Sequence, residues 1–332
     1  MATLKDIAAH CGVDISTVSR VIQGRDIRVS KVTRAKILEA AESLHYRPNA
    51  LARGLKTRRS GAVVFALSNT TRYVYPEIID GAQEKAEELG LCLFLYCYSP
   101  RQAAAESLID LSHEGRFDGV MFHDLPHESF IEELRAASLP FVSLNRYESV
   151  GERYVCLDDE AGFRAQANYL ADIGHRRIGF VGVKPDSEIS RRCRSAFCGA
   201  LEERRITVAP NLMFECDFEG LDFVRVATEI GSGVRRPTAV ATASLATAVH
   251  LVAALKGQNV RVPEDVSIIG YHDAPMGAWH RPALTTVRMP FRIQGRRAVE
   301  RLYDILNGTE PGGEVVGPPP EIVERESCTP LA

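Results

Sequence analysis

The chain has 332 residues, of which 45% are hydrophobic and 25% charged, a composition typical of soluble globular proteins. This length allows about two domains with substantial cores, so neither disulfides nor metals are needed to stabilise them. We find no run of 18 apolar residues and no basic segment leading into an apolar stretch, so we expect neither a membrane span nor a secretory signal. The eight cysteines are then expected to be reduced thiols in a cytoplasmic protein.

Charge is distributed unevenly along the chain. The net charge of −3 combines +7 on residues 1–60, which hold twelve Lys/Arg and five Asp/Glu, with −10 on the remainder. A basic segment attracts an anionic polymer, and an acidic one repels it. The sequence therefore predicts that nucleic acid is bound by the first 60 residues alone.

Residues 1–46 are predicted to form a small helical domain. Two short amphipathic segments separated by Gly12 are typical of a helix-turn-helix, whose second helix, Ile15–Ile22, enters the major groove of DNA. A third helix is expected from residue 31 to about residue 44, with an apolar stripe of Ile37, Leu38, Ala41 and Leu44. The N-cap positions are filled by Thr3 (in a capping box with Asp6), Asp14 and Ser30.

Residues 47–60 are predicted to link this head to the rest of the chain. Asn49 is suited to cap a short fourth helix over residues 50–55, and the basic run that follows is typical of a linker.

From residue 61 onward, short apolar runs alternate with helical patterns. This order predicts parallel sheets with helices on both faces, and its resumption after Asp158 indicates two doubly wound lobes. Ligands of such sheets bind beyond the carboxyl ends of the strands, so the cleft between the lobes is the expected pocket. Strands are expected at residues 62–67, 91–97, 119–122, 141–144, 178–182, 212–215, 239–242, 266–270 and 322–326.

Several strings of residues carry a resemblance to a known family. In the head they are residues 4–8 (LKDIA), 12–13 (GV), 17–20 (TVSR), 29–30 (VS), 33–34 (TR) and 46–49 (YRPN), with Leu55. In the body they are residues 174–178 (GHRRI), 262–271 (VPEDVSIIGY) and 282–286 (PALTT). Over essentially its whole length, the chain resembles the lactose-repressor (LacI/GalR) family of bacterial transcription regulators.

The resemblance implies a fold of class α/β with an all-α head. It places a helix-turn-helix DNA-binding domain at residues 1–46 and a hinge at residues 47–60. Residues 61–332 are then a two-lobed, doubly wound, periplasmic-binding-protein-like body that binds an effector and forms a homodimer. No leucine heptad follows residue 306, so a lactose-repressor-style tetramer is not expected.

The resemblance also implies that each head reads one half-site of a pseudo-palindromic, double-stranded operator. Ile15 offers only apolar contact with a thymine methyl, Ser16 donates or accepts, and Arg20 suits a guanine edge or a phosphate. The hinge becomes helical on the operator and inserts Leu55 into the minor groove. The expected DNA-binding residues are Thr3, Ile15, Ser16, Thr17, Ser19, Arg20, Asn49, Arg53, Leu55 and Lys56.

Plainer interpretations of the head remain open at this point. The helices can form a small subdomain with a solvated basic face, and Leu55 can pack on the body in the free protein.

For the body, the resemblance implies a small metabolite bound between the lobes. The positions carried over are Asn69, Arg72, Tyr75, Asn145, Arg146, Asp158, Arg192, Arg194, Phe218, Ser244, His272 and Asp273. Phe218 is either an aromatic plate against the ligand or a core residue, and Asn145 either binds hydroxyls or forms a turn.

Two departures from the family pattern bear on the effector. Ser244 and Leu245 stand where many members have Asn-Asp, and His272 stands where many have an acid, so acceptors suited to a neutral polyol are lost. Arginine forks match carboxylate and phosphate groups, which favours a sugar acid or sugar phosphate. The alternative is a neutral sugar, with the arginines in structural roles.

Two other classes of protein compete with this interpretation. An enzyme is disfavoured because the common nucleotide-binding, hydrolase and metalloprotease motifs are absent, so no catalytic residue, metal site or cofactor is expected. A periplasmic binding protein is disfavoured by the basic helical head. The sequence thus predicts a transcription regulator, most simply a repressor, that is controlled by a sugar, sugar acid or sugar phosphate.

Overall fold

The computed structural model describes residues 2–22, 27–46, 59–68, 76–98, 104–123, 129–145, 151, 153–183, 188–216, 222–232 and 236–331. Its contacts divide the chain into two compact units, Met1–Ser60 and Gly61–Ala332. The first unit is all-α, and the second is built from parallel sheets and helices. The fold class is therefore α/β with a small helical head.

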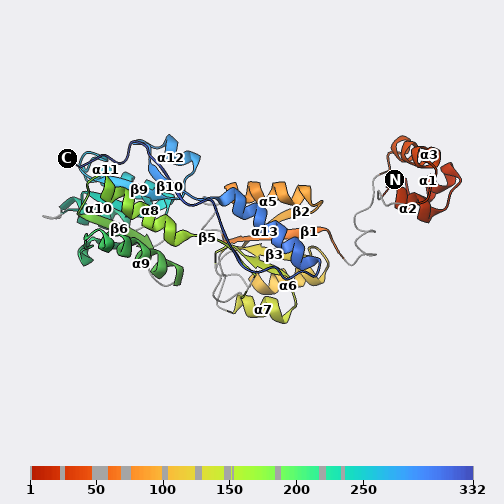
Figure 1. Ribbon diagram of the computed structural model, residues 1–332, viewed down its shortest axis with the longest axis horizontal. Helices are drawn as coiled ribbons and strands as arrows, with labels where there is room; N and C mark the ends of the chain where they lie inside the picture. Colours follow the sequence, from red (N-terminus) through yellow and green to blue (C-terminus); the bar gives the residue numbers. More distant parts are fainter. Residues whose placement is uncertain are drawn as a thin grey trace. The chain divides into compact units, whose positions relative to one another are not determined.

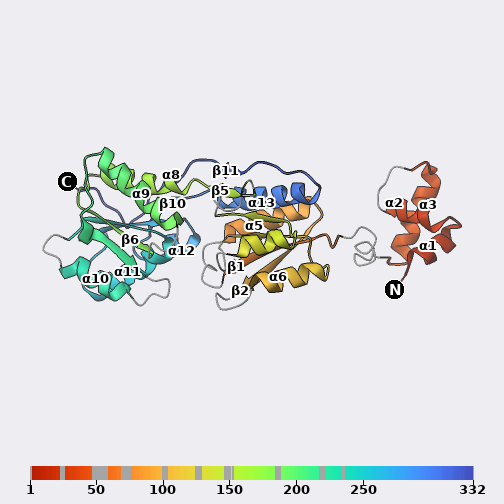
Figure 2. The ribbon, with the colours of Figure 1, turned by 90° about the horizontal axis from the view of Figure 1, so that it is seen from below.

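The head consists of α1 (Leu4–Cys11), α2 (Ile15–Ile22) and α3 (Lys31–Ser43), which Figure 2 shows packed together. The expected capping box begins α1, because the Asp6 carboxylate accepts from the Thr3 N–H (2.7 Å) and the Thr3 hydroxyl accepts from the Asp6 N–H (3.4 Å). Gly12 ends α1 in the left-handed region, at φ +69°. The Ser30 hydroxyl accepts from the Thr33 N–H (3.0 Å) and caps α3.

A small apolar core holds the three head helices together. Ile7, Val18, Val21, Ile37 and Ala40 are its most buried members. The predicted stripe on α3 is wrong at two positions, since Leu38 and Leu44 are exposed. Leu38 is turned about 100° from Ile37 and so leaves the buried face, while Leu44 lies beyond the last turn of the helix.

The first lobe of the body contains a four-stranded parallel sheet in the order β2-β1-β3-β4. Its strands are β1 (Ala62–Ser68), β2 (Cys92–Tyr98), β3 (Gly119–Phe122) and β4 (Phe141–Ser143). The helices of this lobe are α5 (Pro76–Glu88), α6 (Ala104–His113), α7 (Phe130–Ala136) and α13 (Phe291–Leu306). All four strands lie within one residue of the predicted ranges.

The second lobe contains a six-stranded sheet in the order β12-β10-β9-β8-β6-β7. All its neighbouring strands are parallel except β12, which is antiparallel to β10. The strands are β6 (Ile178–Val183), β7 (Met213–Cys216), β8 (Ala239–Thr242), β9 (Ser267–Tyr271), β10 (Thr285–Arg288) and β12 (Glu321–Val323). The helices are α8 (Asp159–Asp172), α9 (Glu188–Glu203), α10 (Phe223–Ser232), α11 (Leu245–Gly257) and α12 (Pro275–Trp279), with a 3-10 turn at Pro210–Leu212.

Segments far apart in sequence complete the first lobe. Helix α13 packs along α5, and Figures 1 and 2 both show the two helices side by side. Strands β5 (Val155–Leu157) and β11 (Glu314–Val316) form a separate parallel pair. Neither strand is among the predicted ranges, because three residues are too few for a periodic pattern to stand out.

Two buried hydrogen bonds from one side chain connect α13 to strands β4 and β5. The Gln294 side-chain amide donates to the carbonyl oxygens of Leu144 (2.6 Å) and Val155 (3.0 Å). It therefore joins the end of β4 to the start of β5, directly beside the passage into the second lobe.

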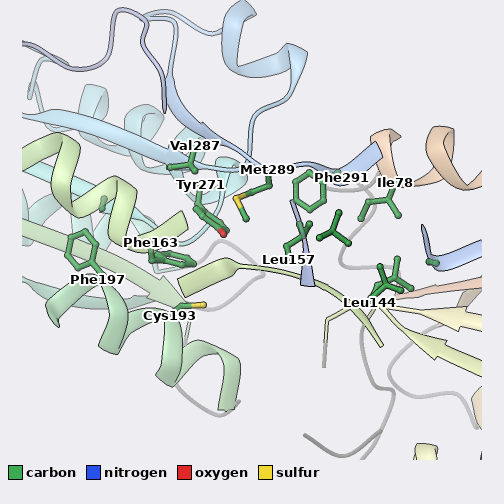
Figure 3. Close-up of a cluster of buried hydrophobic side chains, with 14 of the residues drawn as sticks. Ile78, Leu144, Leu157, Phe163, Cys193, Phe197, Tyr271, Val287, Met289 and Phe291 are labelled. Carbon is green, nitrogen blue, oxygen red and sulfur yellow. The ribbon is translucent and has the colours of Figure 1, made fainter. Parts of the chain in front are cut away.

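One apolar cluster continues across the junction of the lobes. Figure 3 shows Leu144, Leu157 and Phe291 on the first-lobe side and Phe163 and Tyr271 on the second-lobe side. Leu157 and Tyr271, at the carboxyl ends of β5 and β9, and Leu144, directly after β4, thus belong to one apolar cluster.

Candidate functional site

Helix α2 presents a polar face to solvent. Its buried residues are Val18 and Val21, which are three apart and lie on one side of the helix. Ile15, Ser16 and Arg20 are exposed, and Thr17 and Ser19 are partly exposed. The core of the head therefore leaves all five predicted α2 contact residues at least partly accessible to a ligand.

One of the free backbone N–H groups in the first turn of α2 is bound by a side chain of the same segment. The Asp14 carboxylate accepts from the Ser16 N–H (2.8 Å), which makes Asp14 the cap of this helix. Hydrogen bonds from the side chain and backbone of Ser16 hold the pKa of Asp14 below its ordinary value. A phosphate approaching α2 thus meets a negative charge at its first turn, and Arg20 lies one turn further on.

Thr3 is exposed, and its hydroxyl takes part in the N-cap of α1. It donates to the Asp6 carboxylate (2.8 Å), so any DNA contact by this hydroxyl competes with the capping box. The other predicted DNA-binding residues, Asn49, Arg53, Leu55 and Lys56, lie outside the described residues.

A pocket of about 210 Å³ opens at the junction of the two lobes. The pocket is lined by residues at the carboxyl ends of β4 and β5, in the first turn of α8, on one face of α9 and on strand β11. Three of the predicted effector residues, Asn145, Asp158 and Arg192, meet there. The remaining lining residues are Cys156, Leu157, Asp159, Glu160, Cys193 and Val315.

The charge of this pocket is predominantly negative. Among the described lining residues, three are carboxylates and one is a guanidinium. That guanidinium, Arg192, is held by Glu160, which accepts from its Nε (2.8 Å) and Nη2. Arg194 does not line the pocket and instead pairs with Glu215 (3.1 Å).

Asp159 is a pocket residue that the sequence analysis did not single out. The Tyr271 hydroxyl donates to its Oδ1 (2.8 Å), and desolvation by burial raises the pKa of the Asp159 carboxyl. The Tyr271 ring stacks on Phe163 with centroids 4.1 Å apart (Figure 3). No local signal pointed to Asp159, because the preceding strand β5 is too short to be predicted and the neighbouring Asp158 matched the family position.

Several predicted effector residues have structural partners. The Asp158 carboxylate caps α8 by accepting from the Ala161 N–H (2.9 Å). The Ser244 hydroxyl caps α11 by accepting from the Thr247 N–H (3.1 Å).

Asp273 is held even more firmly, because its carboxylate accepts from three side chains. These are the Thr286 hydroxyl (2.7 Å) and the guanidiniums of Arg325 (2.8 Å) and Arg288 (3.0 Å). The hydrogen bonds outweigh the effect of burial and lower the pKa of Asp273. Neither Asp273 nor Ser244 is part of the pocket lining.

His272 follows β9 in the left-handed region, at φ +71°. Its ring lies 4.5 Å from that of Tyr271 and 4.8 Å from that of Phe291, measured between centroids. This enclosure lowers the pKa of His272 to about 3, so the ring is neutral at physiological pH. Its buried Nδ1 has no hydrogen-bond partner among the described residues.

The remaining predicted effector residues, Asn69, Arg72, Tyr75, Arg146 and Phe218, lie outside the described residues. In the part of the chain that the structure describes, no group of three or more His, Cys, Asp and Glu side chains is arranged to hold a metal ion. No helix in that part is long and apolar enough to cross a membrane.

Two family models match the chain. Residues 3–49 match the bacterial regulatory proteins of the lacI family, and residues 167–328 match a periplasmic binding protein-like domain. The first match covers the three head helices, and the second covers most of the second lobe and all of α13.

Whole-length relatives agree with these matches. The chain is 32% identical to the HTH-type transcriptional repressor PurR of Vibrio atlanticus (strain LGP32), over 100% of both chains. It is 30% identical to the protein of the same name from Vibrio vulnificus (strain CMCP6), over 98% of both.

Solved structures share the fold over nearly the full length. A complex of the transcriptional regulator CelR with cellobiose has a TM-score of 0.73 and 28% identity, covering 98% of this chain and 100% of that one. The lac repressor dimer bound to operator and the anti-inducer ONPF has a TM-score of 0.82 at 24% identity, covering 99% of both chains.

Proposed function

Because the chain belongs to the LacI family of bacterial regulatory proteins, we propose that it binds operator DNA through α2 and represses transcription under the control of a small metabolite. The observation that carries this proposal is the division of α2 into a buried face, Val18 and Val21, and an accessible face that includes Ser16 and Arg20. Such a helix offers polar side chains to base edges while the head core keeps it rigid.

The operator is read by two copies of the chain. A dimer matches the two-fold symmetry of a pseudo-palindromic site, and each head contacts one half-site. Arg20 recognises a guanine edge or a phosphate, Ser16 a base edge, and Thr17 and Ser19 phosphate oxygens. Residues 47–60 form the hinge that connects the head with the effector-binding body of residues 61–332, and Leu55 acts as the minor-groove wedge.

The effector is an uncharged polar molecule of the sugar class. The described pocket has more carboxylates than guanidiniums, and Glu160 already neutralises Arg192. An anionic sugar would be repelled there, whereas Asn145, Asp158 and Glu160 offer acceptors to hydroxyl groups. The cellobiose complex of the related regulator CelR supports this choice of the neutral alternative.

We further propose that the protein acts in the cytoplasm and has no catalytic activity. Its relatives are named as transcriptional repressors, and the pocket lacks a nucleophile paired with a base among its described residues. The Cys156 and Cys193 thiols in the pocket have strongly raised pKa values, because burial disfavours the thiolate.

Operator binding tests the first part of this proposal. Operator sequences are selected from random DNA with the full-length protein, and affinities are measured by fluorescence anisotropy at fixed salt. Arg20→Ala should weaken binding by about fivefold or more, because a bidentate contact between an arginine and a guanine edge contributes about 1–3 kcal/mol. Glu42→Ala, on the exposed side of α3, serves as the control and should leave affinity within about twofold. Equal affinities for the wild type and Arg20→Ala would remove α2 from the interface.

A thermal-shift panel tests the effector class. Neutral sugars, sugar acids and sugar phosphates are compared, and a ligand at 100 times its Kd should stabilise the protein by about 2.7 kcal/mol. We expect a neutral sugar to raise the Tm and, by linkage, to change operator affinity by a coupling free energy of about 1–3 kcal/mol. Stabilisation by anionic sugars that is lost in Arg192→Gln would instead identify an anionic effector.

A further inference from the structure

Three consecutive carboxyl groups lie at the start of α8 and line the effector pocket, and they differ in their partners. The Asp158 carboxylate accepts from a backbone N–H in the first turn of the helix (2.9 Å), and that of Glu160 accepts from the Arg192 guanidinium. Among the described residues, the Asp159 carboxyl accepts only from the uncharged hydroxyl of Tyr271 (2.8 Å). Asp159 is therefore the member of this run with the weakest partner for a negative charge.

Packing holds the Tyr271 hydroxyl in a fixed position. The Tyr271 side chain is buried, and its ring stacks on Phe163 (Figure 3). A Cβ at Gly162 would lie 2.5 Å from the Tyr271 oxygen, so the glycine leaves the space that this hydroxyl occupies. Burial and the nearby Asp159 raise the pKa of Tyr271 well above its ordinary value. The hydroxyl thus keeps its hydrogen and donates it to Asp159.

The hydrogen bond from Tyr271 makes the two oxygens of the Asp159 carboxyl unequal. Oδ1 is an acceptor, because Tyr271 supplies the hydrogen. Oδ2 has no hydrogen-bond partner in the part of the chain that the structure describes, and it is not buried. Because Asp159 lines the pocket, a proton on this carboxyl lies on Oδ2, where a bound molecule can accept it.

Groups from three directions act on the charge of Asp159. Desolvation by burial favours its neutral form, and the charge of Asp158 acts in the same direction. The hydrogen bond from Tyr271 and the charge of His123, which follows β3, favour the ionised form. Burial outweighs them and raises the pKa of Asp159 above its ordinary value of 3.8.

The other ionisable groups around the pocket are paired or neutral. On α9, Arg192 is bound by Glu160. Burial raises the pKa of the Cys193 thiol on the same helix and of the Cys156 thiol on β5, so both are neutral. Directly after β9, His272 is neutral above its pKa of about 3. Of these groups, none supplies a free positive charge that would ionise Asp159.

We propose that Asp159 binds the effector as a neutral acid, which keeps its proton on Oδ2 where an ordinary aspartate is ionised and donates it to a hydroxyl or carbonyl oxygen of the ligand. Tyr271 is a positioning residue, because it fixes Oδ1 as the acceptor. The inference rests on the proposed sugar effector and adds a donor to a pocket in which Asp158 and Glu160 only accept. Effector affinity should fall as rising pH ionises Asp159.

Urea unfolding of the full-length wild type and Asp159→Asn, from about pH 4 to about pH 8, tests the neutral state without a ligand. Above pH 3.8 the unfolded chain loses the Asp159 proton while the folded protein keeps it, so rising pH lowers the unfolding free energy of the wild type. The asparagine has no such proton. The unfolding equilibrium constant of the wild type should rise relative to that of the variant, by at most about tenfold per pH unit.

Asp110→Asn, at an exposed position of α6, is the matched control and should keep the wild-type pH dependence. The contribution of His272 is common to all three proteins and cancels in the comparison. Equal pH dependence in the wild type and Asp159→Asn would show that Asp159 ionises as an ordinary aspartate does, which overturns the proposal.

Isothermal titration of the full-length proteins with glucose and cellobiose, two uncharged sugars, tests the donation. The Kd of the wild type and of Asp110→Asn should rise with pH, by at most about tenfold per unit. The Kd of Asp159→Asn should stay constant, because its amide N–H donates at every pH. Asp159→Leu has no donor and should bind about two- to tenfold more weakly than the wild type at the acid end of the range, as expected for one hydrogen bond between uncharged groups.

The outcomes separate this proposal from the proposed function. If a sugar binds and its Kd changes with pH alike in the wild type and Asp159→Asn, the effector class stands and Asp159 is not the donor. The same conclusion follows if Asp159→Leu binds as tightly as the wild type. If neither probe nor any other neutral sugar of the thermal-shift panel binds the wild type, the effector class is wrong, and donation to a sugar is wrong with it.

Discussion

At the scale of single residues, neighbouring polar side chains have different tasks. Asp158 is exposed and caps α8, whereas the carboxyl of Asp159 is desolvated and accepts from the Tyr271 hydroxyl. His272 and Asp273 are divided in the same way, since the buried Nδ1 of His272 has no partner among the described residues and Asp273 accepts from three side chains. Position in the sequence therefore does not decide which of two adjacent polar residues meets a ligand.

His272 should make the stability of the body sensitive to acid. The pKa of His272 is about 3 in the folded protein, whereas its ordinary value is 6.5. Below pH 6.5, the histidine therefore becomes protonated in the unfolded state but stays neutral in the folded state. The contribution of the neutral His272 to the free energy of unfolding is fully present above pH 6.5, and it is lost as the pH falls from 6.5 toward 3. We expect His272→Asn, which tolerates the left-handed backbone, to reduce the loss of unfolding free energy between pH 7 and pH 5 by about 2 kcal/mol.

Urea denaturation at the two pH values measures this effect. His113→Asn, at the exposed end of α6, is the matched control and should keep the wild-type pH dependence. An identical pH dependence in His272→Asn and wild type would show that the enclosed ring titrates normally.

At the scale of elements, helices α5 and α13 pack so closely that two positions in their contact, Gly81 and Gly295, have no room for a side chain. A Cβ at Gly81 would lie 2.0 Å from the Arg292 carbonyl oxygen, and a Cβ at Gly295 would lie 2.0 Å from that of Ile78. The two glycines thus bring the helix backbones together. Around them, Arg292 and Arg296 of α13 pair with Glu84 of α5.

Gly295→Ala should therefore destabilise the body although alanine is the better helix former. The new methyl group forces the helices apart, and such overpacking costs about 1–3 kcal/mol or more. Gly199→Ala in α9 is the control, because a Cβ there has no neighbour within 4 Å. This control should gain about 0.5–1 kcal/mol from helix propensity. Denaturant unfolding of both variants measures the difference, and a stable Gly295→Ala would contradict the close crossing.

At the scale of the whole molecule, the first lobe leaves an apolar edge uncovered. Strand β2 lies at the edge of its sheet, and Phe94 (54% exposed) and Leu95 (50% exposed) face solvent there. Exposed apolar edge strands invite pairing with another chain, and the operator requires two copies of this one. We therefore expect β2 to belong to the dimer interface, with the exposed Trp279 of α12 as its counterpart in the second lobe.

Leu95→Glu should weaken the dimer, because it places a charge in the centre of that interface. The dissociation constant measured by analytical ultracentrifugation should rise at least tenfold, and operator affinity should fall with it. Leu331→Glu, an exposed leucine near the end of the chain, should leave both unchanged. A dimer of wild-type strength in Leu95→Glu would place the interface elsewhere.

The sequence by itself determined the helix-turn-helix head, most strands of both lobes and the family, because caps, periodicity and motifs are local and each is visible within a few residues. Only the tertiary structure decided which polar residues line the pocket and which stabilise helices. Asp159 meets Tyr271 at a separation of 112 residues, and β5 pairs with β11 at a still larger one. Such pairings depend on how the chain passes between the lobes, and burial and charge at the junction are properties of that packing rather than of any local segment.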